Sequence, residues 1–146
     1  MIDDGFDEEL KSIRKQKIEK LKSNQNKMEE KNMNADKNWP STPVNVSDSD
    51  FQDFINKYPL VIIDCWAPWC GPCRILGPVI DELAGAYAGK IAFGKLNTDE
   101  CQATAMSFGI QSIPTMLFFK DGKLASREVG AMPRSMLEPK VKAFMQ

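Results

Sequence analysis

The chain has 146 residues, enough for one ordinary domain with a segment left over. Hydrophobic residues make up 42% of it, and the net charge of −1 gives no basic footprint for nucleic acid. The absence of histidine excludes Ser-His-Asp and Cys-His catalysis. No apolar run reaches the roughly 18 residues of a membrane span, and the charged N-terminus lacks the apolar stretch of a secretory signal. We therefore expect a cytoplasmic protein that binds neither nucleic acid nor membranes.

Residues 1–40 differ in composition from the rest, with many acids and bases in balance and few apolar side chains. On a helix most of the apolar residues would form one narrow stripe: Phe6, Leu10, Ile13, Ile18, Leu21 and Met28. Two interpretations remain open. The segment is a charged extension, partly helical or disordered, or its stripe docks on a partner or on the surface of the domain that we place at residues 41–146.

The first half of that domain begins with a short strand at 43–46, after which Ser47, Asp48 or Ser49 can cap a helix. This helix carries Phe51, Phe54 and Ile55. The continuous apolar run at 60–66 contains one acid, Asp64, and is typical of a strand buried on both faces.

A longer helix follows from Gly71 to Ala88, with Pro78 inside it and core positions predicted at Ile75, Leu76, Val79, Ile80 and Leu83. A strand at 91–96 and a helix at about 101–108 come next. Strand and helix patterns that alternate in this way predict a sheet with helices packed against it.

The last part of the chain predicts a hairpin and a final helix. The strand at 115–119 leads into an Asp-Gly turn at 120–123, and 124–130 returns as its partner. Pro133 opens a helix in which four apolar residues are expected to face inward: Met136, Leu137, Val141 and Phe144. The whole pattern predicts an α/β domain with a central mixed sheet flanked by helices.

The motif Trp66-Ala67-Pro68-Trp69-Cys70-Gly71-Pro72-Cys73 lies between a buried strand and a helix. Cys70 would stand at the helix N-terminus, where free N–H groups and the helix dipole favour a thiolate. Cys73 follows one turn later, within reach of a mixed disulfide on Cys70. The alternative for such a pair is half of a zinc site, but the chain has no second C-x-x-C pair and no histidine. Of the other cysteines, we expect Cys65 in the core and Cys101 either inert or exposed enough for regulation.

The motif resembles the active-site signature of the thioredoxin family, W-A-x-W-C-G-P-C, in every specified position. Further segments agree with the family in order and spacing from about Val44 to the C-terminus: 61–64, 95–99, 109–115 and 129–131. The resemblance implies the thioredoxin fold and a protein-disulfide reductase that needs no cofactor or metal beyond its own redox-active Cys70–Cys73 disulfide. Its implied partners are a thioredoxin reductase and disulfide-containing target proteins, and we expect a monomer.

The resemblance also assigns roles to individual residues. Cys70 would attack the target disulfide, and Cys73 would resolve the mixed disulfide. Asp64 would be a buried carboxylate of raised pKa that takes the proton of Cys73, and Lys95 would oppose part of that pKa shift.

For target binding, the resemblance implies that Pro114 follows a cis peptide bond and that the backbone of Ile113 pairs with an extended substrate strand. A flat apolar docking surface around Cys70 would be formed by Trp69, Gly71, Pro72, Ile113, Gly130 and Ala131. Two other functions stay open at this point: an oxidase or isomerase of disulfides, and a binding module in which the fold serves as an assembly subunit.

Overall fold

The computed structural model of the chain describes residues 39–146. Both interpretations of the N-terminal extension concern residues outside this range. The described elements, in chain order, are β1 (Val44–Val46), α3 (Phe51–Lys57), β2 (Leu60–Trp66), α4 (Gly71–Ala86), β3 (Ala92–Asn97), α5 (Gln102–Ser107), β4 (Thr115–Lys120), β5 (Lys123–Val129) and α6 (Arg134–Phe144). None of the helices described is long and apolar enough to cross a membrane.

The strands form one five-stranded mixed sheet in the order β1-β3-β2-β4-β5. β2 is the central strand, parallel to β3 and antiparallel to β4. β1 adds to β3 in parallel, and β5 completes the antiparallel edge beside β4. Because β2 is flanked on both sides, its apolar run is buried nearly throughout, as the sequence predicted.

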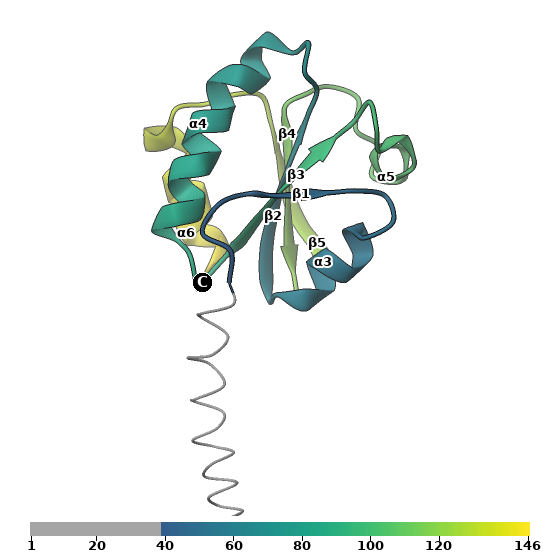
Figure 1. Cartoon of the computed structure of the whole chain (residues 1–146). Coiled ribbons are helices and arrows are strands. Elements are labelled where there is room, and N and C mark those ends of the chain that lie inside the picture. Colours follow the sequence, from purple (N-terminus) through teal and green to yellow (C-terminus); the bar gives the residue numbers. More distant parts are fainter. Residues whose placement is uncertain (1–38) are drawn as a thin grey trace, which may run out of the picture. The chain divides into compact units, whose positions relative to one another are not determined.

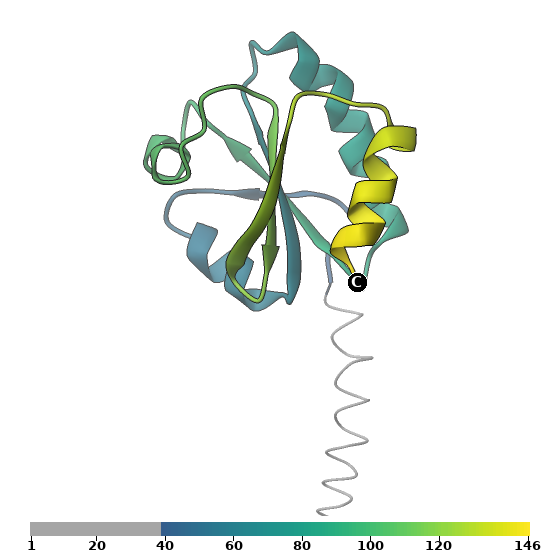
Figure 2. The ribbon, with the colours of Figure 1, turned by 180° about the vertical axis from the view of Figure 1, so that it is seen from behind.

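Helices cover both faces of the sheet, with α4 and α6 on one side and α3 and α5 on the other (Figures 1 and 2). The core beneath α4 and α6 includes Ile62, Leu76, Ile80, Leu83, Phe93, Phe118, Leu137 and Val141. On the opposite side Phe51, Phe108 and Phe119 form an aromatic cluster with ring centroids 5.4 to 5.7 Å apart. The predicted α/β architecture is thus confirmed.

Two predicted core positions are wrong. Ile75 on α4 is 67% exposed and Met136 on α6 is 57% exposed, whereas the residue after each, Leu76 and Leu137, is buried. Successive helical residues are about 100° apart, so a neighbour of an inward residue falls on the flank or the outer side. The predicted apolar faces were one residue too wide.

The predicted capping of α3 by Ser47, Asp48 or Ser49 is also wrong. Asp50 occupies the N-cap position and makes no side-chain cap bond. Asp48 instead accepts two hydrogen bonds from Thr104, one from its backbone N–H at 2.9 Å and one from its hydroxyl. Asp48 therefore caps α5, a helix more than fifty residues away in the chain.

The hairpin between β4 and β5 has the predicted Asp-Gly turn. Asp121 and Gly122 both have positive φ, 53° and 80°, as a tight two-residue turn between twisted strands requires. A Cβ at position 122 would meet the side-chain oxygen of Asn56, which is exposed and can move, so the positive φ is the main reason for glycine at this position.

Candidate active site

The two cysteines of the motif lie where β2 gives way to α4. Cys70 is the N-cap residue of α4, with extended backbone, and its Sγ accepts the backbone N–H of Cys73 at 3.2 Å. Pro72 lies in the first turn, where a proline loses no helical hydrogen bond. The two sulfurs form a disulfide, with the Cα atoms 5.3 Å apart. The backbone of the helix start is therefore already placed to stabilise negative charge on Cys70.

A second loop packs against the disulfide. Ile113 contacts the cluster of Ala67, Cys70 and Cys73, and its carbonyl oxygen lies 3.7 Å from Cys70 Sγ. The Ile113–Pro114 peptide bond is cis, as the family resemblance implied. The loop before β4 and the N-terminal end of α4 meet at the same end of the sheet (Figure 1).

The residues expected to form the docking surface collect at this end. Trp69 is 69% exposed, and Gly71 and Pro72 are exposed beside it. Ile113 is half-buried, as are Gly130 and Ala131, which reach the site because the N–H of Gly130 donates to the carbonyl of Pro114 at 2.8 Å. Pro114 itself is buried. Cys70 is thus a nearly buried residue, 4% exposed, surrounded by more accessible, largely apolar residues.

Asp64 lies on β2 and is buried, with 1% of the residue exposed. Strand alternation puts it on the same sheet face as Ile62, the face covered by α4, whose buried positions include Cys73. Burial raises the pKa of Asp64 to about 6, the positive charge of Lys95 opposes this shift, and the negative charge of Asp81 adds to it. Neither carboxylate oxygen has a hydrogen-bond partner among the described residues.

Lys95 is the direct neighbour of Asp64 across the β2–β3 pair. Its Nζ lies 5.1 Å from the ring centroid of Trp66, a cation–π contact. A Cβ on Gly77 would lie 4.0 Å from the same Nζ, which places the ammonium against α4. The half-buried lysine therefore partly neutralises the carboxylate without a direct ion pair among the interactions described for residues 39–146.

Two contacts of the site were missed by sequence reasoning. The indole N–H of Trp69 donates to Asp99 at 3.0 Å, and the Arg74 guanidinium donates to the carbonyl of Pro68 at 3.0 Å. Both hold the 66–70 loop from outside, one from the β3–α5 connection and one from α4. Polar residues in a loop and on a helix surface carry no periodic signal, so only the tertiary structure shows their partners.

The remaining two cysteines are free and buried, with Cys65 at 0% and Cys101 at 4% exposure. Burial raises the pKa of Cys65 to about 12 and, together with the charge of Asp48, raises the pKa of Cys101. Cys101 donates to the carbonyl of Val46 at 3.6 Å. Neither thiol is exposed, which argues against the regulatory alternative for Cys101.

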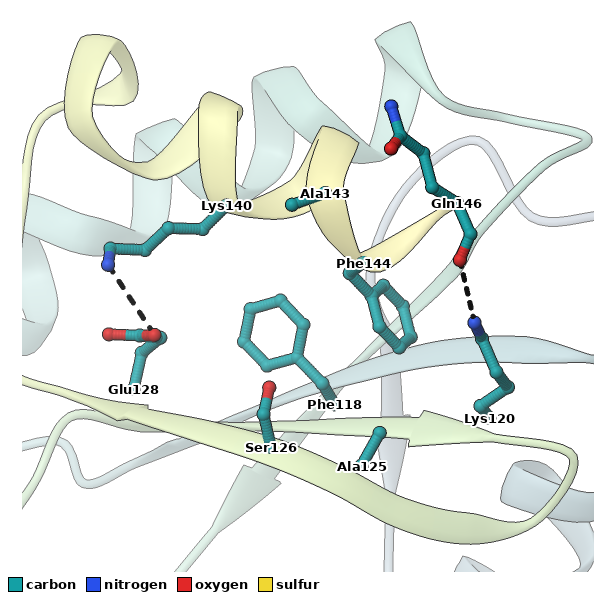
Figure 3. Close-up of a pocket in the computed structure, with 9 residues that line it drawn as sticks. All are labelled: Phe118, Lys120, Ala125, Ser126, Glu128, Lys140, Ala143, Phe144 and Gln146. Atoms are coloured by element: carbon teal, nitrogen blue, oxygen red, sulfur yellow. Dashed lines mark hydrogen bonds and ion pairs between the residues drawn. The ribbon is translucent and has the colours of Figure 1, made fainter.

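Away from the dithiol, an open groove of about 400 Å³ lies between α6 and the β4–β5 hairpin (Figure 3). Its lining is Phe118, Lys120, Ala125, Ser126, Glu128, Lys140, Ala143, Phe144 and Gln146. Neither Cys70 nor Cys73 contributes to this lining, so the groove is separate from the dithiol. No group of three or more His, Cys, Asp or Glu side chains between residues 39 and 146 could hold a metal ion.

Comparisons with known proteins agree with this geometry. The thioredoxin family model matches residues 42–143. The chain is 50% identical over 101 residues to an M-type chloroplastic thioredoxin of Pisum sativum, covering 68% of this chain and 59% of that protein. It is 44% identical over 98 residues to a thioredoxin of Haemophilus influenzae, covering 66% of this chain and 92% of that protein.

Among solved structures, a mutant thioredoxin from Halobacterium salinarum superposes with a TM-score of 0.69 and 30% identity, covering 74% of this chain and 95% of that one. The chain spans 59% and 56% of the length of the Pisum sativum and Spinacia oleracea chloroplastic relatives. With the fold, the cysteine pair at the start of α4 and the family model in agreement, the chain belongs to the thioredoxin family.

Proposed function

We propose that the protein reduces disulfide bonds in other proteins, with Cys70 as the attacking thiolate and Cys73 as the resolving thiol. The observation that carries this proposal is the position of Cys70 Sγ at the N-terminus of α4, where it accepts the N–H of Cys73. A sulfur in that position is stabilised as an anion and remains next to the sulfur that must later displace the client.

The reaction balances as a two-electron exchange. The Cys70 thiolate attacks one sulfur of the client disulfide, the client S–S bond breaks, and the departing sulfur takes up a proton. A mixed disulfide between Cys70 and the client remains. Cys73, after losing its proton, attacks Cys70 Sγ and releases the second client thiolate, which is protonated. The dithiol is now the Cys70–Cys73 disulfide, and the client holds two thiols.

In this proposal Asp64 accepts the proton of Cys73. Its raised pKa of about 6 lies close to neutrality, which suits a group that must take up and return a proton. An extended client segment would bind to the backbone of Ile113 before the cis-proline, and its side chains would rest on Trp69, Pro72 and Gly130. Backbone pairing of this kind allows many different client sequences.

The test is covalent trapping with Cys73→Ser. This variant should accumulate a stable mixed disulfide with a protein client such as insulin, visible as a mass increase that dithiothreitol removes. Cys70→Ser is the control and should form no adduct under the same conditions. If both variants reduce insulin as well as the wild type does, electron transfer through this pair is refuted and the binding-module interpretation takes its place.

The direction of the reaction is tested by the redox potential of the pair. A value well above that of the cytosolic glutathione pool would favour the oxidase or isomerase alternative over the reductase. Regeneration of the dithiol requires a two-electron donor, for which we propose a thioredoxin reductase, as the family implies. The protein would work as a monomer.

For location we propose a reducing compartment and, first of all, the cytoplasm. Two free cysteines beside the active pair fit such an environment. The names of several relatives specify the chloroplast, so imaging of the tagged full chain should compare these two sites.

A further inference from the structure

Ile75 has a large apolar side chain that is not packed in the core. It is 67% exposed, while Leu76 next to it is fully buried on the inner side of α4. A single exposed apolar residue needs no explanation. Ile75, however, follows exposed residues close to Cys70 on the same helix. Its surroundings therefore determine whether it can belong to a binding surface.

Positions 71, 75 and 78 are separated by four and three residues and therefore share one side of α4. We call Gly71, Ile75 and Pro78 the α4 outer face; all three are exposed. This face begins one residue after Cys70, and the exposed Pro72 lies three residues before Ile75 on the same helix, within reach of its side chain.

No neighbouring cation shields Ile75 among the contacts described for α4. Long charged side chains often cover apolar residues on helix surfaces. Arg74, the adjacent long side chain, instead bends back toward the 66–70 loop, where its guanidinium donates to Pro68 at 3.0 Å. The apolar surface of Ile75 is consequently open to a partner.

Ile75 lies close enough to Cys70 to fall within the surface that a bound client protein covers. A rise of 1.5 Å per residue puts the Ile75 backbone about 7.5 Å along the helix from Cys70. Even a small transient interface covers on the order of 500 Å² of each partner, equivalent to a disc of radius about 13 Å. A client whose sulfur is bonded to Cys70 thus reaches the α4 outer face unless its surface curves away.

We infer that Ile75 is a specificity-determining residue, contacting an apolar side chain on the client segment that flanks the attacked cysteine. Clients with a charged side chain there would react more slowly, because the charge would lose water against an apolar surface. This inference rests on the proposed reductase function and adds a preference to it.

The test compares Ile75→Ser with Ile75→Leu, which keeps the apolar surface, and with Leu124→Ser, which removes an exposed apolar residue from the start of β5 (40% exposed). Pre-reduced full-length protein is mixed with insulin, or with the small disulfide 5,5′-dithiobis(2-nitrobenzoic acid). The reaction is stopped at set times by alkylation and analysed by mass spectrometry, which gives the second-order rate constant. Circular dichroism and melting temperature show that each variant is folded.

Ile75→Ser should lower the insulin rate constant about threefold to tenfold, from loss of part of one side chain's burial. Ile75→Leu and Leu124→Ser should stay within about twofold of the wild type. The small disulfide should react equally with all four proteins. An unchanged insulin rate in Ile75→Ser, or an equal fall with both probes, overturns the inference. A wild type that reacts with neither probe would refute the reductase function instead.

A pair of disulfide-linked peptides tests the client preference directly. The peptides are identical except for Leu or Asp beside the attacked cysteine. The wild type should react faster with the Leu peptide than with the Asp peptide. In Ile75→Ser the logarithm of the ratio of these two rate constants should fall to half of the wild-type value or less. A preference that is the same in both proteins would overturn the inference.

Discussion

Asp64 brings an ionisable carboxyl group into the core beneath α4, where neither oxygen has a described hydrogen-bond partner. Such a group is costly in its charged form, and this cost is the main cause of its raised pKa. Lys95 reduces the cost but does not remove it. The residue therefore lowers stability at neutral pH, and the proton transfer proposed above would account for a charge-bearing residue in this place.

The stability cost of Asp64 can be measured through its pH dependence. Between its ordinary pKa of 3.8 and the folded-state value of about 6, the folded protein binds more protons than the unfolded chain. Stability from this group is thus greatest below pH 3.8 and falls as the pH rises through about 6. The total change is about 3 kcal/mol, at about 1.36 kcal/mol for each pKa unit.

Asp64→Asn should abolish the pH-dependent contribution of this residue to the free energy of unfolding. Urea unfolding of both proteins from about pH 3.5 to 8 should show the variant gaining about 3 kcal/mol relative to the wild type across that window. Disulfide reduction should slow at the resolving step while the attack by Cys70 is retained. A stability difference independent of pH would contradict the raised pKa, and an unchanged rate of mixed-disulfide resolution would contradict the role as a base.

At the scale of elements, α5 depends on a cap from a distant segment. This helix has six residues, too few to be stable alone. Asp48, in the β1–α3 connection, accepts the N–H and hydroxyl of Thr104 and so ties the start of α5 to the chain near β1. These hydrogen bonds lower the pKa of Asp48.

Asp48→Ala should lower the melting temperature at pH 7 by a few degrees. Asp48→Asn, which keeps an acceptor oxygen, should lower the melting temperature by less. Because the folded pKa is depressed, the stabilisation is present above pH 3.8 and disappears as the pH falls through the folded value. Thermal unfolding between about pH 2 and 7 checks this. Asp53→Ala, in the first turn of α3, is the control; an equal loss in this variant would show that general charge, not the cap, is responsible.

For the whole molecule, every residue assigned to the dithiol site lies between Asp64 and Ala131, inside the family match. Removal of residues 1–38 should therefore leave the rate of insulin reduction within about twofold of the full chain. Parallel assays of the two proteins with dithiothreitol as the electron donor check this. A fall of about tenfold or more would show that the extension takes part in client binding or catalysis.

Much of the fold was predictable because periodicity reports burial. The run at 60–66 predicted a central strand, and the Asp-Gly pair predicted the hairpin, since each depends on local chemistry. Ile75 and Met136 were misassigned because helical periodicity gives the direction of the core but not the width of the buried face. The sequence contained no sign of the Asp48–Thr104 cap, which joins residues far apart in the chain.

The sequence by itself determined the chemistry: two thiols at the start of a helix, with an acid in the preceding buried strand. These features follow from residue order, because a strand, a turn and a helix N-terminus are local structures. Only the tertiary structure decided what surrounds the thiols. The family resemblance already implied the cis peptide bond before Pro114. The Asp99 partner of Trp69 and the exposure of Ile75, in contrast, depend on how β2, β3 and α4 pack together, which is set by contacts between distant segments.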